Sequence, residues 1–359
     1  MPSIRSFLES YFQIWNGRDN RDQVLRLLQY LPVEPYQSLR NKLLLPLESA
    51  ILDETIDSRQ ALLDFYSALI SQWGVQLRTQ SSSEESVPLT NVVKHAELLA
   101  SSIQEFAPES DSNQTTQTLG ILSVLRFYRC LADLFTHASQ NASIRLTVPL
   151  AATVYTIAFS PCISIISTLN TILADYKLSF ETSLASQVIQ PPNAPEPLYD
   201  TNLVNRFNGY VMDICNLVWR NRALNAEDPN ALGCLIPETS VTALTNHVRN
   251  VNEAARHYDR ESAFHVTLSS VFSLSHHAAF CNLSAACFAE LEEEQQITDN
   301  QLRLRKPVTQ KALQALEKDG GAKYTWQKYR VHMLDWLDEV GSRGTGNLMR
   351  STMKALRQE

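Results

Sequence analysis

The residues best suited to bind a metal ion are two histidines and two cysteines, His276, His277, Cys281 and Cys287. His277 and Cys281 are four residues apart, so they would share one face of a helix. Cys287 lies six residues beyond Cys281 and would point elsewhere, and no fourth ligand is close in sequence. Structural zinc sites usually pair ligands roughly two to four residues apart on turns. We therefore interpret both thiols as small apolar core residues and predict no bound metal.

Two further clusters resemble catalytic motifs but lack the partners that catalysis needs. Gly341–Gly346 is rich in glycine, yet no Gly-Lys-Ser/Thr follows it and no buried strand precedes it, which excludes a phosphate loop. Asp335, Asp338 and Glu339 lie beside Lys and Arg residues, so solvated ion pairs explain them better than acid–base chemistry. The chain also has no nucleophile elbow, His-Glu-x-x-His motif or kinase motif. We predict a protein that is not an enzyme and uses no cofactor, and a metal-dependent enzyme is the least favoured alternative.

The charge is unevenly distributed along the chain. Residues 301–359 carry twelve Lys or Arg and six Asp or Glu, whereas the first 300 residues carry 19 and 32. A basic end on an acidic body favours an acidic partner, either nucleic acid or protein, and a solvated charged face is the alternative. The candidate contacts to DNA or to an acidic partner are Arg303, Arg305, Lys306, Lys323, Lys328, Arg330, Arg343, Arg350, Lys354 and Arg357.

Two tryptophans lie among these cations. Trp326 and Trp336 together with nearby lysines and arginines give the aromatic-plus-basic composition of nucleic-acid-binding surfaces. Their helical spacing places both indoles on an apolar stripe, so we interpret them as core residues of the last helical pair. The surrounding cations would then contact a phosphate backbone without sequence specificity.

The sequence places these residues on a succession of helices. The chain has only 10 glycines in 359 residues and is 44% hydrophobic, which argues against a hairpin-rich β architecture. Apolar residues recur every three or four positions between Leu119 and Ala138, and we expect Pro46 to kink or break its helix. The helix expected at 60–77 carries the apolar residues Leu62, Leu63, Phe65, Tyr66, Leu69, Ile70 and Trp73. The helices expected from this spacing are 4–15, 23–31, 35–45, 60–77, 92–106, 118–138, 146–159, 163–178, 202–219, 240–258, 264–294, 311–316, 326–337 and a basic final helix after a turn at 341–346.

The fold class expected from this pattern is all-α. Helices of this length with short connections are typical of an α-solenoid-like, degenerate HEAT-type stack of antiparallel helix pairs. We divide the chain into an N-terminal helical-repeat segment (1–78), flexible loops around one helix (79–117), a buried helical spine (118–188), a Pro-rich connector (189–200) and a C-terminal helical segment with a basic end (201–359). The six scattered cysteines and an N-terminus without a signal pattern predict free thiols in the cytosol or nucleus.

A series of short motifs resembles one family of helical-repeat proteins. Ile14-Trp15-Asn16-Gly17, Leu44-Leu45-Pro46-Leu47 and Phe207-Asn208-Gly209-Tyr210 occur in the order and rough spacing found in the CENP-I family of the inner kinetochore. The likeness extends over most of the chain and is greatest to the C-terminal half of that family. The residues that carry it, each expected to be structural, are Trp15, Gly17, Pro32, Trp73, Tyr128, Phe207, Trp219, Trp326 and Trp336.

The resemblance implies a function that the residue patterns alone do not. It implies a non-enzymatic scaffold of the constitutive centromere-associated network in the nucleus, at the centromere and kinetochore. Its expected partners are the coiled-coil subunits CENP-H and CENP-K, with CENP-M in some lineages, near centromeric nucleosomes and their DNA. It also implies that the long N-terminal repeats of the family are missing here. The alternative is a helical-repeat adaptor of transport or trafficking with no chromatin role, whose basic end would serve acidic peptides or membrane surfaces.

Overall fold

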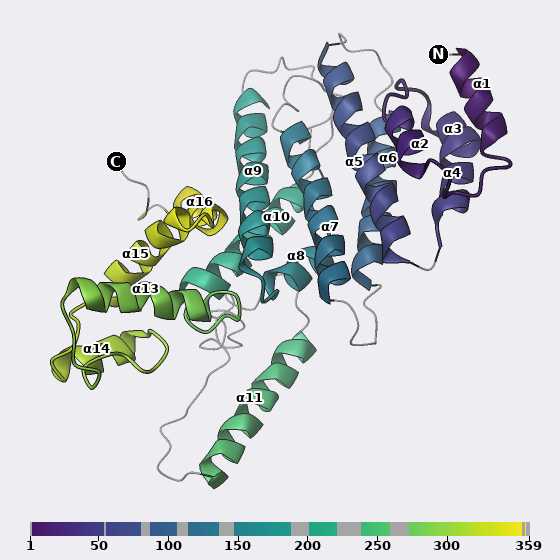
Figure 1. Cartoon of the computed structure of the whole chain (residues 1–359). Helices are drawn as coiled ribbons and strands as arrows, with labels where there is room; N and C mark the ends of the chain where they lie inside the picture. The colour runs from purple at the N-terminus through teal and green to yellow at the C-terminus, as the bar shows by residue number, and fades with distance from the viewer. Residues whose placement is uncertain are drawn as a thin grey trace. The chain divides into compact units, whose positions relative to one another are not determined.

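The computed structural model describes residues 2–53, 55–79, 87–105, 114–135, 147–187, 201–220, 238–258, 273–353 and 356 (Figure 1). Every regular element in these ranges is a helix and none is a strand, so the prediction of an all-α, stacked-helix fold is confirmed. The loops expected at 79–89 and 108–117 are shorter than expected, because residues 79, 87–89 and 114–117 are helical. The rest of these loops, the connector at 189–200, Cys234, Lys354 and Arg357 lie outside the described residues.

The chain forms two compact units, and neither is continuous in sequence. Unit 1 consists of Met1–Thr153 and Asp175–Leu203, and unit 2 consists of Val154–Ala174 and Val204–Glu359. The divisions fall within three helices, α8 (Ala151–Ala158), α9 (Ile163–Gln187) and α10 (Thr201–Cys215). The first half of α9 therefore belongs to unit 2 and the second half to unit 1.

The centre of unit 1 is α5 (Ile56–Thr79), which packs against α6 (Val87–Glu105) and α7 (Gln114–Phe135). The apolar residues that the sequence predicted on this helix are buried. The indole Nε1 of Trp73 donates to the Leu31 carbonyl at 2.8 Å, which ties α5 to the end of α2 (Arg21–Leu28). The buried α5 residues are Leu62, Leu63, Phe65, Tyr66, Leu69, Ile70 and Trp73.

We expected Pro46 either to kink or to break its helix, and the helix is not broken. Helix α3 (Tyr36–Leu39) continues through a π-helical turn (Arg40–Leu44) into α4 (Leu45–Ile51), with Pro46 in the first turn of α4. Proline has no N–H to donate and its ring crowds the preceding turn, and a widened π turn accommodates both within a continuous helix. Gly17, after α1 (Pro2–Tyr11), has φ 72° and lies against the Ala50 backbone, where a β-carbon would not fit.

Most of unit 2 comes from the chain after Val204. Helix α10 (Thr201–Cys215) ends in a π-helical turn (Asn216–Arg220), and α11 is Glu238–Tyr258. Helices α13 (Cys281–Glu294), α14 (Gln310–Lys318), α15 (Trp326–Glu339) and α16 (Arg343–Thr352) follow, and α15 packs against both α13 and α16.

Two expected boundaries in unit 2 are wrong. The described part of the long helix expected over 264–294 begins at Cys281, because residues 273–280 form turns. There Nδ1 of His277 accepts from the Ala279 N–H at 3.1 Å, a side-chain bond that competes with helical pairing. The turn expected at 341–346 ends at Ser342, and Gly344 and Gly346 lie inside α16. Glycine is needed at Gly344 because the α16 backbone lies against the Ser167 carbonyl of α9.

Candidate functional site

The basic end of unit 2 is built on α14 and the two loops that flank it. We call residues 303–328 the basic segment; its cations are Arg303, Arg305, Lys306, Lys311, Lys318, Lys323 and Lys328. Leu313 and Leu316 bury one side of α14, and the Thr309 hydroxyl caps its N-terminus by accepting from the Ala312 N–H at 3.2 Å. The helix ends at Lys318, and Gly320 two residues later has a φ of 90°, a left-handed conformation that is common just after a helix C-terminus.

The acidic C-terminus of α13 meets the start of the basic segment. The Glu292 carboxylate is buried and accepts from the Leu304 N–H at 2.7 Å. The Arg303 guanidinium lies 3.9 Å from the Glu293 carboxylate and donates to the Ile297 carbonyl at 3.1 Å. Acidic residues at a helix C-terminus oppose the helix dipole, and here a backbone N–H and an arginine of the same chain compensate them. Arg303 is thus engaged within the protein.

Arg330 is held inside unit 2 and has no carboxylate partner among the described residues. Its guanidinium lies 4.5 Å from the ring centroid of Trp219 and 5.4 Å from that of Trp326, and it donates to the Trp219 carbonyl. That carbonyl belongs to the π-helical turn at the end of α10, where helix carbonyls lack intrahelical partners. Burial lowers the pKa of Arg330. Arg330, one of the predicted DNA contacts, therefore interacts with aromatic rings and a backbone carbonyl of its own chain.

Arg350 forms a fork between two carboxylates of α15. It donates to Asp338 at 2.6 Å and to Asp335 at 2.8 Å, and these hydrogen bonds raise its pKa against the opposing effect of burial. Two of the three carboxylates noted in the sequence, Asp335 and Asp338, therefore form ion pairs that join α16 to α15.

The remaining described candidates are exposed. None of them forms an ion pair with another described residue, although Arg305 donates to the Asn300 carbonyl at 3.3 Å. Two exposed lysines of α14, Lys311 and Lys318, were not among the predicted contacts and extend the same surface. The excess of cations after residue 300 was the signal that could have identified them. The exposed predicted cations are Arg305, Lys306, Lys323, Lys328 and Arg343.

The two tryptophans of α15 are half-buried instead of fully enclosed. Trp326 stacks on Tyr329 with ring centroids 5.8 Å apart and also faces Arg330. Nε1 of Trp336 donates to the Glu290 carboxylate of α13 at 2.7 Å. Both indoles contact neighbouring residues of unit 2, but neither is fully buried as a core residue would be.

Most residues of the family-like motifs are buried. Pro32 is exposed, and Trp326 and Trp336 are half-buried. Tyr128 packs beside Phe127 on α7 at a centroid distance of 5.0 Å, and the Trp15 indole donates to the Asp19 carbonyl at 2.8 Å. The buried set is Trp15, Gly17, Trp73, Tyr128, Phe207 and Trp219.

The two histidines of the rejected metal motif bond other groups of the protein, and the Cys287 thiol is buried. Nε2 of His277 bonds the Ala158 carbonyl at 2.9 Å and His276 bonds the Ser273 hydroxyl at 2.8 Å. Burial raises the pKa of the Cys287 thiol to about 12, with Glu290 and Glu294 contributing. Over the described ranges, no three His, Cys, Asp or Glu side chains gather closely enough to hold a metal ion. Nor does any helix in those ranges combine the length and apolarity that crossing a membrane requires.

Comparison with known proteins reveals a distant similarity. No protein-family model matches the chain. The chain is 19% identical over 238 residues to Centromere protein I of Gallus gallus, a match that covers 63% of this chain. The matched part spans 30% of the relative's length.

Proposed function

We propose that this chain is a non-enzymatic scaffold of the inner kinetochore, which binds helical subunits of the CENP-H and CENP-K type and supports kinetochore assembly at centromeric chromatin. The observation that carries the proposal is the similarity to Centromere protein I, joined to a stacked all-α fold. Stacked helices offer extended surfaces that suit helical partners. CENP-M and other centromere-network proteins are further candidate partners, and the proposed location is the nucleus.

We include a contact between the basic end and the DNA backbone in this proposal. The exposure of the cations supports this DNA contact. Five predicted cations and two lysines of α14 are exposed, whereas Arg303, Arg330 and Arg350 are engaged within unit 2. Exposed lysines and arginines neutralise phosphates and release counterions, which makes such binding salt-dependent and independent of sequence.

The DNA contact predicts that only the exposed cations contribute to the salt dependence. Binding of the full chain to a labelled duplex is measured by fluorescence anisotropy over a range of salt concentrations. The variant Lys306→Gln/Lys323→Gln/Lys328→Gln should reduce the slope of log K against log[salt] by up to about 2–3, since each lost phosphate contact removes about 0.9. Arg330→Met is the matched control and should leave the slope unchanged while lowering stability. Equal slopes for wild type and the triple variant would remove DNA from the proposal.

The scaffold function is tested by localisation and by reconstitution. A fluorescently tagged full chain should form centromeric foci, and the purified chain should co-elute with a purified CENP-H and CENP-K pair in size-exclusion chromatography. A diffuse cytoplasmic signal with no co-elution would contradict the scaffold function and favour the adaptor alternative.

A further inference from the structure

Helix α1 ends at Tyr11, and hydrogen-bonded turns continue it to Trp15. We use α1 below for the helix together with these turns, which carry apolar residues on two faces, only one of them buried. Leu8, Phe12 and Trp15 face the core of unit 1, whereas Phe7 exposes 62% and Ile14 84% of its surface. Tyr11 lies between these two along the chain, is partly exposed, and stacks on Phe7 with centroids 5.6 Å apart and planes 14° apart. We call Phe7, Tyr11 and Ile14 the apolar stripe.

The spacing of the apolar stripe is that of a helix–helix seam. Its members are separated by four and then three residues, the alternation by which two helices pack knobs into holes. In Figure 1, α1 lies at the edge of unit 1. The outer face of an edge helix in a helical stack is normally polar, because an apolar edge favours association. The sequence of α1 therefore departs from the expected pattern at the position where a further helix would pack.

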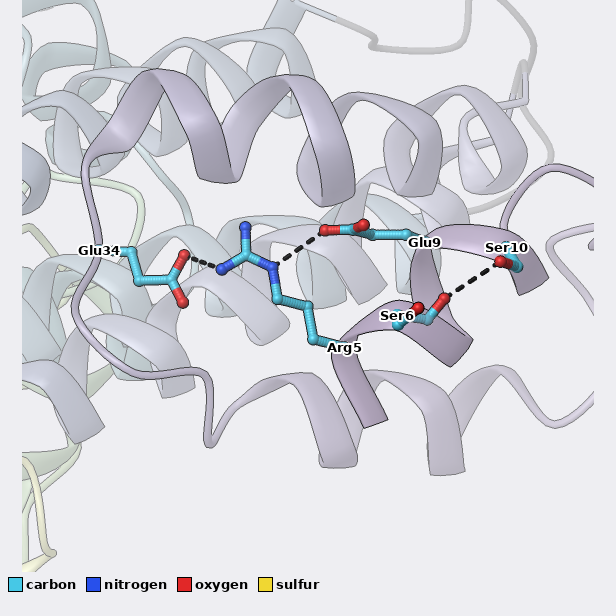
Figure 2. A network of polar contacts seen from close by, with 5 residues as sticks. All are labelled: Arg5, Ser6, Glu9, Ser10 and Glu34. Atoms are coloured by element: carbon cyan, nitrogen blue, oxygen red, sulfur yellow. Dashed lines mark hydrogen bonds and ion pairs between the residues drawn. The ribbon is translucent and has the colours of Figure 1, made fainter. Parts of the chain in front are cut away.

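The charged residues of α1 are engaged within unit 1. Arg5 donates to Glu9 one turn along α1 at 3.0 Å and to Glu34 in the segment before α3, and Figure 2 shows its guanidinium between the two carboxylates. These hydrogen bonds raise the pKa of Arg5. Arg5 thereby links α1 to the segment before α3, on a helix whose Leu8 side chain is buried and whose Phe7 side chain is exposed.

Small or uncharged residues flank the apolar stripe. Ser6, Ser10 and Gln13 are exposed, and the Ser10 hydroxyl bonds the Ser6 carbonyl at 3.1 Å, as Figure 2 shows. We call these three residues the neutral flank. In paired helices the flanking positions select partners by charge, so a neutral flank fits a helix whose own flanks are uncharged.

The area of the stripe argues against a second copy of this chain as its occupant. An aromatic side chain offers about 150–250 Å², so the three side chains together expose on the order of 300–400 Å². A stable symmetric dimer needs about 800 Å² from each partner. A single helix that packs along one groove matches the smaller area, and binding elsewhere on the scaffold would add affinity to it.

We propose that the apolar stripe of α1 docks one amphipathic helix of a partner protein, with apolar residues at three- and four-residue spacing and uncharged flanks. The inference rests on the scaffold function proposed above for the biological identity of that helix. The docking itself requires only the geometry and charge of α1.

The test measures binding of the full chain to a synthetic helical peptide with leucine at three- and four-residue spacing and alanine or serine flanks. Phe7→Ser/Ile14→Ser should weaken binding about tenfold or more, and Ser10→Lys should weaken it by placing a charge on the neutral flank. Leu98→Ser, at a residue of α6 that is 68% exposed, is the control and should bind as wild type does. Circular dichroism checks that each variant remains folded.

The outcomes separate this inference from the scaffold function. If the wild-type chain does not bind the peptide, or the stripe and flank variants bind it equally well, the docking inference is overturned. It is also overturned if light scattering shows a concentration-dependent dimer that Phe7→Ser/Ile14→Ser abolishes, because the occupant would then be a second copy. Peptide binding without co-elution of the CENP-H and CENP-K pair supports the docking inference and contradicts the scaffold function.

Discussion

Glu97 of α6 is a half-buried carboxyl whose charge the protein compensates poorly. Burial raises its pKa to about 7, and Lys94, one turn earlier, opposes the shift only in part. Its Oε1 atom is enclosed and has no hydrogen-bond partner among the described residues. A carboxylate in that position is less stable than a neutral acid, because Lys94 and the Thr147 hydroxyl compensate only part of the hydration that burial removes.

We expect Glu97 to make the stability of the protein pH-dependent. The unfolded carboxyl ionises near about 4.3, whereas the folded one retains its proton to about 7, so stability falls as pH rises between these values and then levels off. Relative to wild type, Glu97→Gln should gain about 2–3 kcal/mol between pH 5 and pH 8, at about 1.4 kcal/mol per pKa unit. Urea unfolding at the two pH values measures the gain. Glu317→Gln on the exposed side of α14 controls for loss of a carboxylate, and a gain independent of pH would contradict the assignment.

The residue patterns in the sequence predicted burial well and internal pairing poorly. The spacing on α5 identified seven residues that are all buried, because helical periodicity is a local property. The hydrogen-bond partners of Arg330 and Arg350 could not be predicted from local spacing. Arg330 bonds a carbonyl 111 residues away, and Arg350 bonds acids 12 and 15 residues away across a turn. Such pairings depend on how helices pack, which the composition of a basic segment does not reveal.

At the scale of elements, the contact between α9 and α16 depends on one glycine. The Gly344 N–H donates to the Ser167 hydroxyl at 3.0 Å, and the Asn170 amide of α9 donates to the Thr345 hydroxyl at 3.0 Å. These bonds form only because the two backbones approach closely at Gly344. The sequence placed this glycine in a turn, since a glycine-rich stretch is more often a turn than a helix contact.

Gly344→Ala should therefore destabilise unit 2 despite the higher helix propensity of alanine. The added methyl group would meet the Ser167 carbonyl, and overpacking of this kind costs about 1–3 kcal/mol. Chemical denaturation of the full chain measures the loss. Asn347→Ala, an exposed substitution on the same helix, should be nearly neutral or slightly stabilising. If the two variants were equally stable, the close approach of α16 to α9 would be wrong.

At the scale of the whole molecule, the two proposed surfaces belong to different units. The apolar stripe is on α1 of unit 1, and the basic segment surrounds α14 of unit 2. They share no helix and no hydrogen-bonded residue among those described. Substitutions in groups without shared partners usually have additive effects.

Combining Phe7→Ser/Ile14→Ser with Lys306→Gln/Lys323→Gln/Lys328→Gln should thus reproduce the sum of the separate effects. Peptide affinity should fall as in the first variant alone, and the DNA salt slope should fall as in the second alone, within about 0.5 kcal/mol. A double-mutant cycle measured with both ligands tests this expectation. A coupling well above that value would show that the two surfaces act as one site.

The division of α9 between the units sets an order for folding on the ribosome. Residues 154–174 leave the exit tunnel before unit 1 is complete at Leu203, yet the rest of their own unit begins only at Val204. At about 5–20 residues per second, synthesis of the 156 residues from Val204 to Glu359 takes roughly 8–30 s. During that interval the first half of α9 has no completed unit 2 to bury Ile165, Ile166 and Leu169. We expect a chaperone to be needed most during this interval, when these apolar residues are not yet buried by unit 2.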